Sequence, residues 1–411
     1  MLLGHSRARL VLAALALGSC VAPMRQARAA DPSPPGAPLD AETDAKVVAA
    51  LAKGRAFLVG RRDAASGGFG DKFTGGVSAG YTAMVVAALI AATPREAIAS
   101  DATIVSALDF VAAAQKENGS IATNPRFANY ETSAAVLALA SARIAKYGAA
   151  QARARDFLVS IQIAGDESAA DFGGFPYAKG QGVDLSNVQF AATALSDAEL
   201  PADSPVWARM QTFLARVQNR SETNTFVAKG KVDDKPVEVV SGNDGGAVYA
   251  PGTAKVPLVA RADGRYEAPS YGSMTYALLK CLLFSGAPAT DARVVAAVGW
   301  IARHFTVERN PGFETAPDPA KAGMQGYYYY LVTMARALAT YEKAIGRPFP
   351  VKDEAGASHD WRREIATKLV GLQRDDGSYV NETAERWDEG NALLATSYAL
   401  QTLAICRGRL P

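Results

Sequence analysis

Residues 368–379 read KLVGLQRDDGSY, and this stretch decides the fold. A helical run ends near Leu369, Gln373 follows it, and a turn containing Gly377 leads to the aromatic Tyr379. A Gln side chain can bond the free backbone groups of a helix end, and an aromatic ring can pack against the turn. Similar units recur along the chain, and six of them start at Phe57, Phe110, Phe157, Phe213, Trp300 and Lys368.

Each unit predicts a helical hairpin. The helix before the turn, as in residues 45–60, has apolar residues near i, i+3/i+4 spacing and is expected on the outside. The helix after the turn is rich in Ala, Leu and Val with little charge, which indicates burial on most sides. These apolar helices are predicted at residues 80–92, 130–144, 185–198, 271–284, 327–345 and 391–406.

Six hairpins can stack as an open superhelix or close into a ring. Ala-rich helices permit the close approach that an inner ring requires. We therefore predict an all-α fold, an α/α toroid of about six helical hairpins with inner and outer helix rings.

Two long polar segments interrupt the repeat. Residues 219–269 lack a helical period, and within them Lys235–Val240, a Gly-rich turn and Ala247–Tyr249 predict a small β-hairpin. The second segment is residues 306–326. Both lead into inner-helix starts, so we expect them beside one mouth of the ring, with Asn224–Tyr249 as one wall.

The composition excludes several classes of protein. The 411 residues are 49% hydrophobic and carry a net charge of +2, which excludes a disordered chain and gives no sign of a nucleic-acid partner. Three Cys and three His are too few for a disulfide scaffold or a Cys/His zinc cluster. We expect neither a metal nor a cofactor.

The N-terminus indicates export. Residues 1–29 combine early arginines, an apolar run and the small-x-small site Ala27-Arg28-Ala29, as in a secretory signal peptide. Leu17-Gly18-Ser19-Cys20 fits a lipoprotein cleavage box equally well, which would attach the protein to a membrane through Cys20. A Pro-rich linker is predicted at 30–44, before the toroid at 45–411. The predicted location is extracytoplasmic: periplasm, cell envelope or secreted.

The repeat units resemble those of the prenyltransferase and squalene-cyclase superfamily. The matching residues are Asp109-Phe110…Gln115…Gly119, Asp156-Phe157-Leu158…Gln162…Gly173-Gly174-Phe175 and Leu372–Tyr379. Ser270–Ala277 and Gly326–Tyr330 are similar to an exported bacterial branch of that superfamily without an assigned reaction. The resemblance implies an α/α toroid with a hydrophobic, isoprenoid-like ligand in its central funnel.

The family's chemical motifs are missing from this sequence. It contains no Asp-x-Asp-Asp acid motif and no Asp-x-Cys zinc motif, and Asp233-Asp234 and Asp375-Asp376 are expected in solvated turns. Two alternatives to the isoprenoid-binding toroid stay open. One is a secreted polysaccharide lyase or glycoside hydrolase on the same fold, and the other is a non-catalytic binding protein.

The starts of the inner helices supply the candidate site, because in a toroid they line one mouth. Glu131, Asp184 and Glu389 are the candidate general acids or bases. Ser273 and Asn391 also suit helix caps. The candidate ligand-binding residues are Tyr81, Tyr130, Asn187, Gln189, Tyr271, Ser273, Tyr327, Tyr328, Trp387 and Asn391. Cys281 and Cys406 lie in apolar runs and are expected as buried free thiols, with a disulfide between them as the alternative.

Overall fold

The computed structural model describes residues 39–71 and 75–409. The predicted signal sequence, Cys20 and most of the predicted linker lie outside these residues. The first helix begins at Ala41, inside the predicted linker, because the Asp40 carboxylate caps it by accepting the Thr43 N–H at 2.9 Å. No helix within the described ranges is long and apolar enough to cross a membrane.

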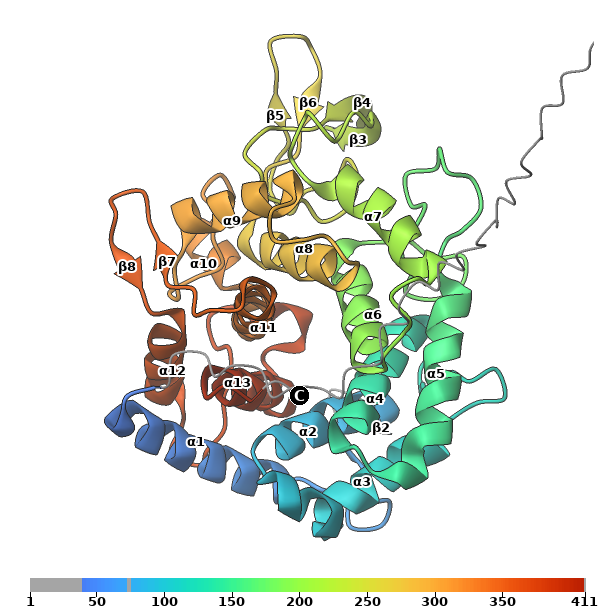
Figure 1. Ribbon diagram of the computed structural model, residues 1–411, viewed down its shortest axis with the longest axis vertical. Coiled ribbons are helices and arrows are strands. Elements are labelled where there is room, and N and C mark those ends of the chain that lie inside the picture. Colours follow the sequence, from blue (N-terminus) through green and yellow to red (C-terminus); the bar gives the residue numbers. More distant parts are fainter. Residues whose placement is uncertain (1–38, 72–74, 410–411) are drawn as a thin grey trace, which may run out of the picture. The chain divides into compact units, whose positions relative to one another are not determined.

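The six apolar helices form a closed inner ring (Figure 1). Each one packs against the next along the chain, and the last packs against the first, so the toroid is confirmed and the open superhelix is wrong. Every predicted range matches the observed helix to within two residues at both ends. The helices are α2 (Ala79–Ala91), α4 (Ala128–Ala142), α6 (Leu185–Asp197), α8 (Gly272–Phe284), α11 (Tyr327–Ile345) and α13 (Ala392–Cys406).

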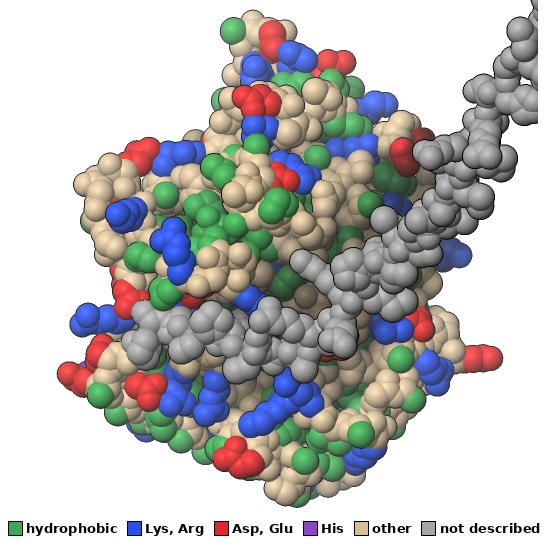
Figure 2. Space-filling view, in the orientation of Figure 1, with side chains coloured by type: hydrophobic (Ala, Val, Ile, Leu, Met, Phe, Trp, Pro, Cys, Tyr) green, Lys and Arg blue, Asp and Glu red, His purple; other side chains and the backbone are tan. Residues whose placement is uncertain are grey.

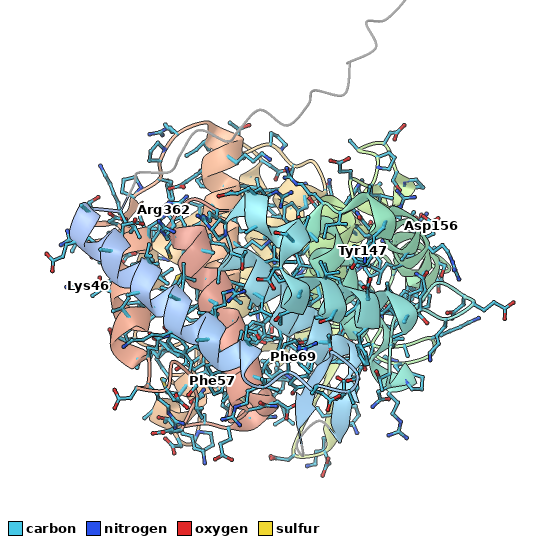
Figure 3. All side chains as sticks on the ribbon, turned by 90° about the horizontal axis from the view of Figure 1, so that it is seen from below. Lys46, Phe57, Phe69, Tyr147, Asp156 and Arg362 are labelled. Atoms are coloured by element: carbon cyan, nitrogen blue, oxygen red, sulfur yellow. The ribbon has the colours of Figure 1, made fainter. Side chains whose placement is uncertain are left out.

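The amphipathic helices surround this ring. In one of them, Pro205–Val217, the buried residues Val206, Met210, Phe213 and Val217 form one apolar stripe at helical spacing. Figure 3 looks onto the outer ring, where the labelled Lys46 and Asp156 lie on its exposed polar face. The outer helices are α1 (Ala41–Val59), α3 (Ala102–Ala113), α5 (Gly148–Ile161), α7 (Pro205–Val217), α9 (Ala292–His304) and α12 (Trp361–Leu372).

The repeat glutamines join neighbouring hairpins. Gln373 donates from Nε2 to the Gly377 carbonyl of its own turn at 3.1 Å and to the Ala50 carbonyl of α1 at 2.8 Å. It therefore connects the last hairpin to the first and closes the outer ring. The predicted structural role of these residues is confirmed, since the same pair of bonds is made by Gln115, Gln162 and Gln218.

The insertion carries a small sheet, but the predicted hairpin pairing is wrong. Strand β3 (Ala228–Val232) pairs with β4 (Lys235–Val240) through the exposed turn Asp233-Asp234, where φ is 48° and 59°. The Gly-rich stretch has the composition of a strand turn, yet Gln218 bonds the Gly245 carbonyl. Residues 245–249 are therefore the displaced turn of the fourth repeat.

Short elements complete the chain. Strands β5 (Val259–Ala260) and β6 (Tyr266–Glu267) extend the insertion into a four-stranded sheet at the rim of the ring (Figure 1). Charges of both signs are interspersed over the face shown in Figure 2. The other short elements are β1 (Phe69–Asp71), β2 (Gly76–Ser78), α10 (Pro319–Met324), β7 (Val351–Lys352) and β8 (Ser358–His359).

Both cysteines of the helical part are buried free thiols, as predicted, and the alternative disulfide is wrong. Cys281 lies on α8 and Cys406 on α13, which are not neighbours in the ring. Burial raises the pKa of each thiol to about 12, so both stay protonated.

Candidate functional site

Glu131 lies at the start of α4 and fixes the backbone around it. Its Oε2 accepts the N–H groups of Gly80 at 3.1 Å and Thr123 at 2.8 Å, and its Oε1 accepts that of Asn124 at 3.1 Å. Gly80 belongs to the first turn of α2, so one carboxylate caps a neighbouring inner helix and holds the loop before its own helix.

Glu389 does the same for α11. Its Oε1 accepts the Tyr329 N–H at 2.8 Å, and its Oε2 accepts the Asn381 amide at 2.9 Å. The side chain is 1% exposed. Burial raises the pKa of this carboxyl to about 7, although the hydrogen bonds act against that rise.

Asp184 caps its own helix and meets the insertion. Its Oδ1 accepts the Asn187 N–H at 2.9 Å, and its Oδ2 accepts the Tyr249 hydroxyl at 2.6 Å. The Tyr177 hydroxyl lies 3.0 Å from that of Tyr249. Burial and the nearby Asp184 charge raise the pKa of Tyr249. The insertion thus reaches the start of α6.

These three acids are used as acceptors within the fold. No hydrogen bond among residues 39–71 and 75–409 joins any two of them, and each one organises a different segment. Their roles as general acids or bases, and the sugar chemistry that would need two of them together, stay predictions.

Several of the predicted ligand residues also serve the helix starts. Asn391 caps α13 by accepting the Leu393 N–H at 2.9 Å. Ser273 pairs with Asn310, whose Oδ1 accepts the Ser273 N–H at 2.9 Å. The Asn187 amide bonds the Asp184 carboxylate.

The tyrosine run faces more than one direction. Tyr327 donates its hydroxyl to the Val307 carbonyl at 2.5 Å, and Tyr328 packs against Tyr379 with ring centroids 5.9 Å apart. Both are buried, and so is Tyr271, which packs on Phe313 with centroids 5.2 Å apart. Within the run, Tyr329 lines a cavity that lies inside the ring of inner helices.

Trp387 and Lys255 mark an exposed aromatic and cationic region. Trp387 is 44% exposed, and it and Asp388 have φ values of 60° and 63°. Lys255 lies over the Tyr249 ring at 3.3 Å and 5.7 Å from the Trp387 ring centroid. The Tyr81 hydroxyl donates to Asp388 at 3.1 Å, so this region joins α2, the insertion and the segment before α13.

A partly enclosed cavity lies inside the ring. Its volume of ≈ 40 Å³ has room for about three water molecules. Of the predicted ligand residues only Gln189 lines it. All six inner helices contribute, through Met84, Ser133, Leu137, Gln189, Phe190, Thr193, Lys280, Tyr329, Val332, Thr333, Arg336, Tyr398 and Gln401.

Aromatic rings form one wall of this cavity. Phe190 packs edge-on against Tyr130 with centroids 4.7 Å apart, and Tyr329 lies 6.0 Å from Phe190 and 6.2 Å from Tyr398. The hydroxyls of Tyr130 and Tyr398 are 3.1 Å apart. Tyr130 therefore supports the wall from behind, as the second predicted residue near the centre.

Two cations lie among these cavity residues. Lys280 is 2% exposed and donates to the Gln189 Oε1 at 2.5 Å. Burial, with the nearby Arg336 charge, lowers the pKa of Lys280 to about 7. Arg336 is paired with Asp197 at 2.5 Å.

Neither cation is among the predicted site residues, and the cavity combines these two cations with aromatic and aliphatic side chains. A usable signal existed, since Lys280 interrupts the run ALLKCLLF of a helix predicted to be buried on most sides.

No metal site is visible in the described part of the chain, where no three His, Cys, Asp or Glu side chains gather. No family model matches the chain, and no curated protein matches it in sequence.

Solved structures do match. One is the apo form of a variant of the type II terpene cyclase MstE from Scytonema, with a TM-score of 0.52, 14% identity, and coverage of 90% of this chain and 99% of that one. Another MstE variant, in complex with geranylgeranyl dihydroxybenzoate, has a TM-score of 0.51, 13% identity, and coverage of 89% and 99%. A glycosidase matches with a TM-score of 0.49, 13% identity, and coverage of 91% and 100%. The two MstE similarities show the fold alone, a toroid like that of a terpene cyclase.

Proposed function

We propose that this protein binds a small amphiphilic molecule in the central cavity. The apolar, isoprenoid-like part lies against the aromatic wall, and an oxygen-bearing head lies toward Lys280 and Arg336. One observation carries the proposal: a cavity lined by all six inner helices combines aromatic rings with two buried cations.

The polar side of the cavity favours an oxygen acceptor. Lys280 is bonded to a neutral amide, so its ammonium form lacks a bonded counter-charge. A carboxylate, phosphate or carbonyl oxygen placed there would accept a charge-assisted hydrogen bond at a site with little water. The rings of Phe190, Tyr329 and Tyr398 would cover the apolar part of the same molecule.

The fold comparison supports the isoprenoid part of the proposal. The MstE variant described above was solved with geranylgeranyl dihydroxybenzoate, whose name joins an isoprenoid chain to an oxygen-rich head. The cavity of ≈ 40 Å³ is much smaller than such a molecule. A ligand of that length would displace rings of the aromatic wall, so the ligand of this protein is shorter or moves Tyr329 and Tyr398.

The proposal is tested by native mass spectrometry and lipid extraction of the protein purified from its host. Lys280→Met keeps most of the side-chain volume and removes the amine, and Lys46→Met is the matched control on the exposed face of α1. The wild type and the control should retain the same small molecule, and Lys280→Met should lose at least ~90% of it, because loss of a charge-assisted bond costs roughly 1.5–3 kcal/mol. Wild-type protein that is empty and takes up no isoprenoid acid would refute the proposal.

We also propose that the mature protein is extracytoplasmic, on the evidence of residues 1–29 alone. Its intact mass distinguishes the two forms of export: cleavage after Ala29, or a lipid-modified chain beginning at Cys20. An uncleaved N-terminus in host material would refute both.

A further inference from the structure

We propose that Lys280 is a nucleophilic amine, which forms an imine with an aldehyde or ketone bound in the central cavity. This inference rests on the proposed function to the extent that the cavity must admit a small molecule. It adds a covalent site and a chemical class of ligand.

The geometry sets Lys280 apart from other lysines. It lies in the buried middle of α8, lines the cavity, and bonds the Gln189 Oε1 at 2.5 Å. No ion pair in the described part of the chain includes it, because the neighbouring carboxylate of Asp197 is taken by Arg336. Gln189 orients the amine without giving it a negative partner.

The groups around Lys280 favour its neutral form. Desolvation penalises the ammonium most, Arg336 adds repulsion, and only Asp197 and the buried Cys281 act in the other direction. The resulting pKa of about 7 leaves about half of the amine unprotonated at neutral pH. Burial beside a second cation is a known way to activate a lysine nucleophile.

The step balances without an oxidant or reductant. The amine lone pair attacks the carbonyl carbon, a C–N bond forms, and a proton moves from nitrogen to oxygen to give a carbinolamine. The C–O bond then breaks, and the oxygen leaves as water with the second amine proton. Tyr329 and Tyr398 line the same cavity, and their hydroxyls, each 3.1 Å from that of Ser186 or Tyr130, can relay these protons.

The aromatic wall selects the carbonyl compound. Rings of Phe190, Tyr329 and Tyr398 favour an apolar substituent on the carbonyl carbon, and the polar side chains face its oxygen. An isoprenoid aldehyde meets both conditions, but it exceeds the ≈ 40 Å³ of the cavity and therefore enters only when Tyr329 and Tyr398 move.

Reductive alkylation of the full chain tests the proposal. The protein is treated with formaldehyde, or with the isoprenoid aldehyde citral, in the presence of sodium cyanoborohydride, and modification of each lysine is followed by peptide mass spectrometry from pH 5 to 10. Lys46 is the internal control, because it is exposed and the pKa of its amine is raised by Glu42. The neutral fraction of Lys280 at pH 7 should be about 10³-fold larger than that of an ordinary lysine.

We expect Lys280 to react with both aldehydes, with a rate midpoint near pH 7, while the rate for Lys46 lies far below its own plateau at pH 7 and keeps rising toward pH 10. Lys280→Met should remove the neutral-pH adduct and keep the wild-type circular dichroism spectrum. An unmodified Lys280 in protein whose Lys46 is modified, or a Lys280 profile that rises only with that of Lys46, would overturn the inference.

The two proposals fail separately. A wild-type protein that retains a ligand but shows no Lys280 adduct after the ligand is extracted keeps the binding proposal and rejects the imine. An adduct with formaldehyde but none with citral, in a protein that retains no isoprenoid, rejects the isoprenoid part of the binding proposal and keeps the reactive amine.

Discussion

Replacement of Glu389 by Gln should flatten the pH dependence of stability. The folded carboxyl has a pKa of about 7 against an ordinary value of 4.5, because burial outweighs its hydrogen bonds. A folded pKa above the unfolded one means that folding favours the protonated form. The stability from this group is therefore full below pH 4.5 and is lost as the pH rises to about 7.

The size of the effect follows from the shift. Roughly 2.5 pKa units correspond to about 3 kcal/mol. In Glu389→Gln the new amide oxygen would still accept the Tyr329 N–H, but the amide nitrogen would face the Asn381 donor, which adds a cost that does not change with pH.

Urea unfolding followed by far-UV circular dichroism, at half-unit steps from pH 4 to 8, measures the free energy of unfolding of both chains. The other titrating groups cancel in the difference between them. Wild type should lose about 3 kcal/mol relative to Glu389→Gln across pH 4.5–7. A constant difference, or one that grows in favour of wild type with rising pH, would show that the backbone N–H bonds outweigh desolvation and would refute the reasoning.

Three further predictions concern the ring and its centre. Gln373→Ala removes two hydrogen bonds and should lower the free energy of unfolding by about 2 kcal/mol, with faster amide exchange in α1 than Gln115→Ala produces, because Gln373, unlike Gln115, bonds α1 from the last hairpin. Gly377→Ala should lower the free energy of unfolding more than Gly346→Ala does. Both glycines have positive φ, but of the two only Gly377 would place a Cβ 2.4 Å from a backbone oxygen, that of Lys53. The unfolding midpoints of the two variants in urea test this. Lys280→Met should stabilise the protein below pH 7 by up to about 5 kcal/mol, and the gain should vanish between pH 7 and 10.5, because the lowered pKa of Lys280 makes its protonated form costly; an equal gain at pH 6 and 10.5 would contradict this.

The fold could be predicted because its signals are local. An apolar helix buried on most sides can be recognised from its own Ala-, Leu- and Val-rich composition, without knowing which helices it packs against. The predicted inner helices therefore match the observed ones to within two residues. The Gln–Gly units were equally visible where the glycine follows closely. In the fourth unit Gln218 and Gly245 are 27 residues apart, and the strand-like sequence between them hid the connection.

The candidate site was predicted less well for a physical reason. Polar residues at the starts of buried helices have two uses, binding a ligand or satisfying free N–H groups, and the sequence pattern is the same for both. Glu131, Asn391 and Asp184 are all engaged in the second use. Which face of an inner helix points to the ring axis depends on the packing of all six, so Tyr329 could not be separated from Tyr327 and Tyr328 by spacing.

The Lys280 amine is a buried group that the backbone hydrogen bonding of the fold does not use. The capping carboxylates and the glutamines each hydrogen-bond backbone groups that would otherwise lack a partner. These bonds offset the free-energy cost of burying the side chains. The Lys280 amine satisfies no backbone group, and its desolvation destabilises a helix that Leu or Met would suit better. Local rules are broken mainly where function requires it. A buried amine that weakens the ring, beside a cavity reached by all six inner helices, is therefore best explained by the molecule that enters that cavity.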